Sequence, residues 1–142
     1  MKVIVAVVAF AVSQTQATAA DDQISCPEKI SAESRVLAPP PSWEVRYEGT
    51  EAQLKAVGFY DGPPSEGASL VYDKESHNRK TTTASWHFPA NDGRGYWVSC
   101  AYSDTSAVLI KKLASTISQC DVAYARDVSI DGLPAIQSIH CK

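Results

Sequence analysis

The sequence predicts a mainly β domain: an antiparallel meander that forms a small sandwich or a partly open barrel, with minor helix and two disulfides. Short apolar stretches are interrupted by Pro, Gly, Asp and Asn roughly every ten residues, the spacing of strands and turns in such folds. The chain of 142 residues suits one domain, and its four cysteines are an even number, as in a disulfide framework.

The clearest predicted strand covers residues 81–88. Its β-branched and aromatic residues alternate, so that Trp86 and Phe88 point to one face and His87 to the other. Turn signals, the first at Asn91-Asp92-Gly93, separate this strand from 96–102 and then from 107–112, so these strands are expected to form one meander. The other expected strands are 30–37, 43–47, 57–60, 69–72, 120–124 and 136–141.

Two stretches carry helical signals. Thr50 and Gln53 have the spacing of a capping box, which favours a short helix over residues 50–57. Ile110, Leu113 and Ile117 have helical spacing, so a strand running into a helical turn is expected there.

The first 19 residues have the pattern of an export signal. Lys2 precedes an apolar run from Val3 to Val12, and Ala17-Thr18-Ala19 is a small-x-small cleavage pattern. The run rises only about 15 Å as a helix, half of a bilayer core of about 30 Å, which favours a cleaved signal over a membrane anchor. We therefore expect a signal peptide at 1–19 and a periplasmic or secreted domain at 20–142, with no membrane insertion after cleavage.

The charge of the chain argues against nucleic acid as a partner. The formal net charge is −3, and removal of Lys2 with the signal changes it to −4. Nucleic-acid binding requires clustered Lys and Arg, so no nucleic-acid partner is expected.

The cysteines predict disulfides. All of them lie in the expected mature domain, and three pairings are open. We favour Cys120 with Cys141, because the turn signal Asp131-Gly132-Leu133-Pro134 lies between them, and Cys26 with Cys100, which would tie down the N-terminal end. No C-x-x-C pair is present, so neither a metal site nor a redox-active pair is expected.

No catalytic constellation is recognised in the sequence. It has no G-x-S-x-G elbow, no phosphate-binding loop and no calcium-loop pattern. Asp61 and Glu66 bracket a loop and are candidates for a carboxylate pair, although a solvated turn explains them as well. We expect no enzyme and no cofactor.

The segment 58–67 has the composition of a binding loop. Aromatic residues lead into a loop that two prolines stiffen and glycines frame, and a stiff loop loses little entropy on docking. The alternative is a tight connection between two strands with Phe59 in the core. The candidate binding residues are Tyr60, Asp61, Pro63, Pro64 and Glu66.

Several motifs together resemble a known family. They are Cys26-Pro27, Trp43, the run Gly58-Phe59-Tyr60-Asp61-Gly62-Pro63-Pro64, Trp86, the run Trp97-Val98-Ser99-Cys100-Ala101-Tyr102, and Cys120. Their order and spacing are similar to those of a family of small exported proteobacterial proteins of unknown function, some of them linked to secretion-system immunity. The resemblance implies a periplasmic address and an inhibitor or immunity role, and it supplies no catalytic residue.

The expected function is therefore a non-enzymatic periplasmic binding module. Its expected partner is an envelope protein, and its expected role is that of an inhibitor or immunity protein against an envelope (cell-wall) enzyme. The alternative is a periplasmic protein that binds a small molecule or a peptidoglycan fragment in a pocket lined by tryptophans.

Overall fold

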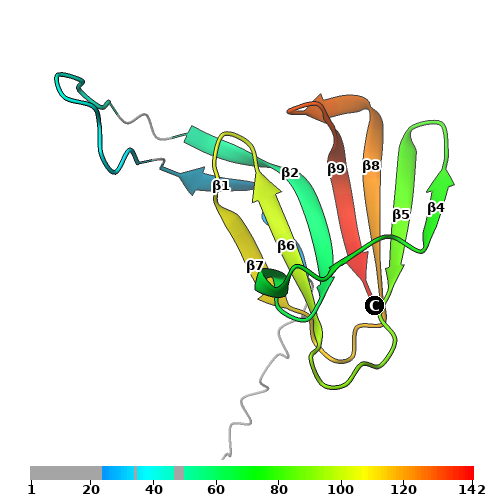
Figure 1. The fold of residues 1–142 in the computed structure, drawn as a ribbon. Helices are drawn as coiled ribbons and strands as arrows, with labels where there is room; N and C mark the ends of the chain where they lie inside the picture. The colour runs from blue at the N-terminus through cyan, green and yellow to red at the C-terminus, as the bar shows by residue number, and fades with distance from the viewer. Residues whose placement is uncertain (1–23, 34, 47–49) are drawn as a thin grey trace, which may run out of the picture.

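Two antiparallel sheets make up most of the described chain, which comprises residues 24–33, 35–46 and 50–142 of a computed structural model (Figure 1). In the first sheet the strand order is β1 (Lys29–Ala32), β2 (Thr50–Asp61), β6 (Tyr96–Tyr102), β7 (Val108–Lys112), and β3 (Ser69–Leu70) pairs with β2. In the second sheet it is β4 (Lys74–His77), β5 (Thr81–His87), β8 (Gln119–Ile130), β9 (Leu133–Cys141). The predicted signal peptide lies outside the described residues.

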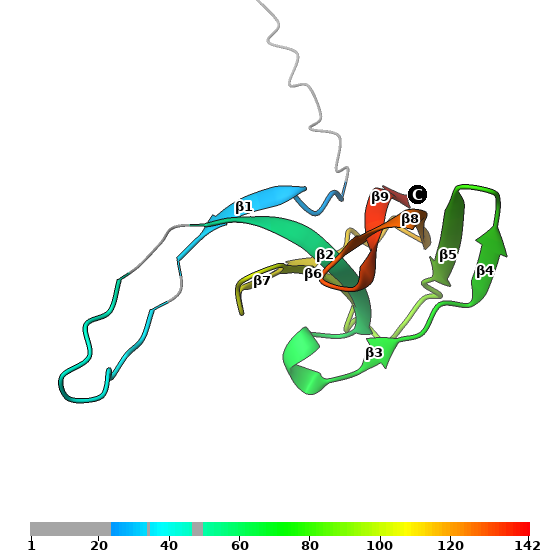
Figure 2. The ribbon, with the colours of Figure 1, turned by 90° about the horizontal axis from the view of Figure 1, so that it is seen from above.

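The two sheets curl around a shared interior, as the view from above shows (Figure 2). Strand β9 lies beside β2, and the chain through β3 runs along the lower side of the view in Figure 2 on the way to β4. The predicted mainly β, antiparallel fold is thus confirmed. In the residues that the structure describes, its minor helix is the 3₁₀ turn η1 (Pro64–Glu66). None of the helices in the described part of the chain is long and apolar enough to cross a membrane.

The strands form where apolar residues recur at every second position. On β5, Ala84 and Trp86 are buried and His87 is exposed, as predicted. On β6, Val98, Cys100 and Tyr102 are buried. Alternate side chains of a strand point to opposite faces, so each sheet turns one apolar face to the interior.

Aromatic rings connect the two sheets across the interior. Phe59 of β2 is fully buried, and its ring centroid lies 5.0 Å from that of Trp86 and 5.4 Å from that of Phe88. Phe88 in turn lies 4.9 Å from Tyr96 of β6. Tilted aromatic pairs at these separations contribute beyond the apolar area that they bury.

The predicted meander of 81–88, 96–102 and 107–112 is wrong in one respect. β6 and β7 do form an antiparallel hairpin, but β5 pairs with β4 and β8 in the other sheet. The Asn91-Asp92-Gly93 turn therefore belongs to a connection that crosses between sheets. The contact of Phe88 with Tyr96 spans this crossing.

The predicted helix over residues 50–57 is also wrong, because this stretch is the first part of β2. Ala52 and Leu54 are buried at alternate positions, and β2 pairs with both β1 and β6. Beyond the Leu54–Tyr102 pair, Gln53 also bonds to Ser103: the Gln53 N–H donates to Ser103 Oγ (3.0 Å), and the Gln53 carbonyl accepts from the Ser103 N–H (2.8 Å). Pairing on both sides outweighs a local capping signal.

Two other expectations are partly met, and a third, the strand at 43–47, is not met over its described residues. The stretch 110–117 continues strand β7 to Lys112 and then makes one turn, in which the Ile117 N–H donates to Ala114 O (3.0 Å). The strand expected at 30–37 is shorter, at Lys29–Ala32. Residues 43–46 form no strand, and Tyr47 lies outside the described residues. Trp43 is 73% exposed.

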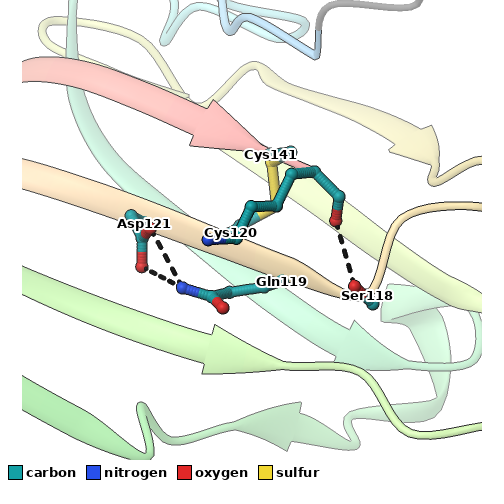
Figure 3. Close-up of a disulfide and its surroundings, with 6 residues drawn as sticks. Ser118, Gln119, Cys120, Asp121 and Cys141 are labelled. Carbon is teal, nitrogen blue, oxygen red and sulfur yellow. Dashed lines mark hydrogen bonds between the residues drawn. A yellow bond between two sulfur atoms is a disulfide. The ribbon is translucent and has the colours of Figure 1, made fainter.

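Both favoured disulfides are present. Cys26–Cys100 ties the N-terminal segment to β6, and Cys120–Cys141 joins directly opposite residues of β8 and β9 (Figure 3). The β8–β9 hairpin turns at Asp131 and Gly132, which have positive φ angles of 50° and 78°, as a two-residue hairpin turn requires. Beside the second disulfide, Ser118 Oγ donates to Lys142 O at 3.3 Å.

Loss of either disulfide is expected to lower the free energy of unfolding, and the longer loop should matter more. The sequence separations are 74 for Cys26–Cys100 and 21 for Cys120–Cys141. Loop-closure entropy then gives about 4.5 and about 3.4 kcal/mol, respectively. Urea unfolding of the two paired alanine variants measures this difference.

Both variants lose two sulfur atoms, so the difference between their free energies of unfolding reflects mainly the length of the loop that each disulfide closes. A larger loss of stability on removal of Cys120–Cys141 would contradict this account.

Candidate functional site

The candidate binding loop is a tight structure between β2 and β3. β2 ends at Asp61, and Gly62 follows with φ of 86°. The 3₁₀ turn η1 ends at Glu66, and Gly67 caps it with φ of 74°. The chain then returns, and β3 pairs with β2 so that Ser69 lies opposite Tyr60. The positive φ angles at both glycines are unfavourable for other residues, so the glycines that frame the loop define its shape.

The connection between β5 and β6 holds this loop from one side. Asn91 Nδ2 donates to Asp61 Oδ1 (3.0 Å), and the Gly62 N–H donates to Gly95 O (2.9 Å). Arg94 Nη2 donates to Asp61 O (3.3 Å) and forms an ion pair with Glu66. The loop is therefore braced by residues about thirty positions further along the chain.

These contacts give Asp61 and Glu66 different surroundings. The Asp61 carboxylate is half-buried and accepts from Asn91, so it helps to position the loop. Glu66 and Arg94 each have side chains that are 50% exposed, and an ion pair so exposed contributes about 0–1 kcal/mol. The Asp61 carboxylate thus bonds to Asn91 and the Glu66 carboxylate to Arg94. Such contacts are typical of a turn with a fixed shape.

The remaining candidate residues are partly covered. Pro63 and Pro64 are half-buried, and the exposed tip of the loop is Ser65–Gly67. The Tyr60 ring leans over Gly58, since a Cβ added at Gly58 would lie 3.4 Å from Tyr60 Cε2. Tyr60 thus lies on the outer face of the first sheet, opposite Trp97 of β6.

Burial at the base of the loop raises the pKa of Tyr96, and the nearby negative charge of Asp61 raises it further. The Tyr96 hydroxyl therefore keeps its proton at neutral pH and donates to Pro89 O at 2.8 Å. This bond fixes the start of the connection that braces the loop.

A second concave feature lies on the inner face of the second sheet. It is a groove of about 690 Å³, and the aromatic residues that line it are Tyr72, Trp86 and Tyr124. The Tyr72 and Trp86 rings meet edge to face at 5.9 Å. Polar lining residues include Glu75, Thr82, Arg126 and Asp127.

Hydrogen bonding to Glu75 and the negative charge of Glu75 raise the pKa of Tyr72, with a smaller contribution from desolvation. Burial raises the pKa of Tyr124. Both phenols are neutral at physiological pH. No local motif in the sequence joins Tyr72, Glu75 and Tyr124, because they lie in the β3–β4 connection, on β4 and on β8, respectively.

The histidines are dispersed over the second sheet. His87 Nδ1 lies 3.3 Å from Asp73 Oδ2, and the backbone N–H of His87 donates to the same oxygen at 2.7 Å; this backbone bond is the main reason why the pKa of Asp73 is lowered. His77 Nε2 lies 3.2 Å from Glu75 Oε1. Across residues 24–33, 35–46 and 50–142, no three His, Cys, Asp or Glu side chains are grouped so that they could hold a metal ion.

Comparison with known proteins gives one match. The family model described as Type VI secretion system Tli immunity protein matches residues 48–142. No curated protein and no solved structure matches the chain. The matched range contains β2 to β9, the braced loop, the groove and three of the cysteines, and it confirms the link to secretion-system immunity that the motifs suggested. The chain belongs to the Type VI secretion system Tli immunity protein family.

Proposed function

We propose that this protein is a periplasmic immunity protein that binds and neutralises a type VI effector enzyme acting in the cell envelope. The observation that carries the proposal is the family match over residues 48–142, which is most of the described chain. Two disulfides fit an oxidising compartment, and the export pattern of residues 1–19 supplies a route to the periplasm.

The braced loop supports binding as the means of neutralisation. A partner that docks on a preformed loop loses little conformational entropy, and this loop is held at both ends by β2 and β3 and from the side by Asn91 and Arg94. We propose that Tyr60, Pro63, Pro64 and Glu66 contact the effector. Asp61 keeps the loop in place.

The full chain is expected to protect susceptible cells from a competitor. The attacker is the source strain with an active type VI secretion system, and the target is a derivative that lacks this chain. Expression of the full chain in the target should restore survival in co-culture, measured as viable target cells, because the effector is bound where it arrives.

An attacker with an inactive secretion system is the control. Deletion of residues 2–19 should abolish protection, because the chain then stays in the cytoplasm. Equal protection by this variant would contradict the periplasmic part of the proposal, whereas no protection by the full chain would contradict the immunity role.

The contribution of the loop can be measured with Glu66→Gln. The expected result is an approximately tenfold weaker affinity for the effector, about 1.4 kcal/mol, because a charged contact at the loop tip is lost. Glu51→Gln is the matched control: Glu51 also forms an exposed ion pair, with Lys29 at 3.2 Å, but on β2 away from the loop. If the two variants have equal affinities by calorimetry, the loop does not contact the effector.

The groove favours a second candidate function, the binding of a small molecule or a peptidoglycan fragment. A ligand against Trp86 and Tyr72 should shift tryptophan emission. The variant Trp43→Phe is the better reporter, since it removes the most exposed indole among the tryptophans. Titration of soluble peptidoglycan fragments should then shift the emission maximum, and an unchanged spectrum would count against this function.

A further inference from the structure

Strand β7 is the last strand at one end of the first sheet, and β4 is the last strand at one end of the second. Their outer edges differ in composition. β4 has the sequence Lys-Glu-Ser-His, and charged residues are the usual protection of an edge against pairing with another chain. β7 begins instead with Val108, Leu109 and Ile110, which are 50%, 40% and 55% exposed. Among the described strands, β7 pairs with β6 alone. Its outer edge is therefore unpaired within the described part of the chain, and the first three residues of the strand are apolar.

The hydrogen-bond pattern identifies the backbone groups on this edge. The Leu113 N–H donates to Tyr96 O at 2.8 Å, which makes this pair a hydrogen-bonded one. Hydrogen-bonded pairs alternate along an antiparallel ladder, so Leu109 and Lys111 also bond to β6. The N–H and C=O groups of the residues between them point away from β6. These residues are Val108, Ile110 and Lys112.

The outer face of the first sheet continues this apolar edge. Across the sheet, Ile110 lies beside Ser99 and then Gly58. The neighbouring row contains Val108, Ala101 and Ala56. Because the neighbouring side chains on β6 and β2 are small, Val108 and Ile110 project from the edge of this face. An added strand would cover them.

Charge indicates what kind of strand fits. Lys111 and Lys112 have no acidic partner among residues 24–33, 35–46 and 50–142. If β7 of a second copy were added so that Val108 lies opposite that copy's Ile110, the lysines would face its Ala107 and Ser106. In that register neither lysine has an acidic residue directly opposite it, whereas a foreign strand with an acidic residue at either position would match the charge.

We propose that an extended segment of the effector adds to the free edge of β7 as a further strand. Its apolar residues cover Val108 and Ile110, and an acidic residue meets Lys111 or Lys112. Addition of a strand to an exposed edge is a common mode of peptide recognition, in which main-chain hydrogen bonds provide affinity and alternate side chains provide specificity. This inference rests on the proposed function, because that function supplies the partner.

The test uses the mature chain and the purified type VI effector of the source strain, with its catalytic residue inactivated. Ile110→Pro removes an outward N–H and keeps the bonds to β6, as proline on an edge strand can. It should weaken binding at least tenfold. His77→Pro is the matched control on β4, where the N–H also points outward, because the next residue, Asn78, donates to Thr81 O (2.9 Å). It should bind as wild type does.

A second pair of variants tests the inference even if the proline variant fails to fold. Ile110→Lys places a charge on the edge, and Val71→Lys places one at an apolar residue that is 81% exposed elsewhere. Only Ile110→Lys should weaken binding. In the wild-type complex, hydrogen exchange should slow at the amides of Val108, Ile110 and Lys112, and not at His77.

The outcomes separate the two proposals. Wild-type binding with equal affinity for all four variants would overturn the inference and leave the immunity role standing. Light scattering that shows a wild-type dimer, which Ile110→Pro dissociates without weakening effector binding, would assign the edge to self-association and also overturn it. If the wild type does not bind the effector, the proposed function fails, and the inference fails with it.

Discussion

The packing of Phe59 against Trp86 and Phe88 is the contact on which the positions of the other features depend. Phe59 is fully buried, and its partners come from the opposite sheet. Trp86 Nε1 also donates to Leu70 O (3.2 Å), and Leu70 lies opposite Phe59 in the β2–β3 ladder. The same aromatic cluster thus fixes the strand that enters the braced loop and the strand that leaves it. A loop so anchored keeps its shape without a partner.

The disulfides act where this cluster does not reach. Cys26–Cys100 attaches the N-terminal segment to the first sheet, and Tyr102 Oη donates to Pro27 O (3.0 Å) next to it. Cys120–Cys141 closes the open end of the β8–β9 hairpin. A small domain with an interior open on one side buries limited apolar area, so covalent links replace part of the stability that a larger core would provide.

Local patterns in the sequence correctly predicted the features that depend on neighbouring residues, namely strands and tight turns. Alternation identified β5 and β6, and the Asp131-Gly132 turn indicated that Cys120 and Cys141 would meet. The errors came from long-range pairing: no local signal shows that residues 50–57 are paired on both sides, or that β5 and β6 lie in different sheets. The composition of the loop is local and could be recognised in the sequence. The bracing by Asn91 and Arg94 and the unpaired edge of β7 depend on long-range pairing and could not be predicted.

The braced loop and the edge of β7 are two ends of one surface. Tyr60, Trp97 and Lys112 lie side by side on neighbouring strands of the first sheet, so the row from the loop to the edge spans about 10 Å. The Tyr60 ring covers Gly58 on this face, and the next rows toward Val108 contain only small or apolar residues. A single partner that adds a strand to β7 would therefore also reach Tyr60. Such a partner would gain affinity from backbone hydrogen bonds to the strand edge, and its side-chain contacts with the edge and with the loop would add specificity.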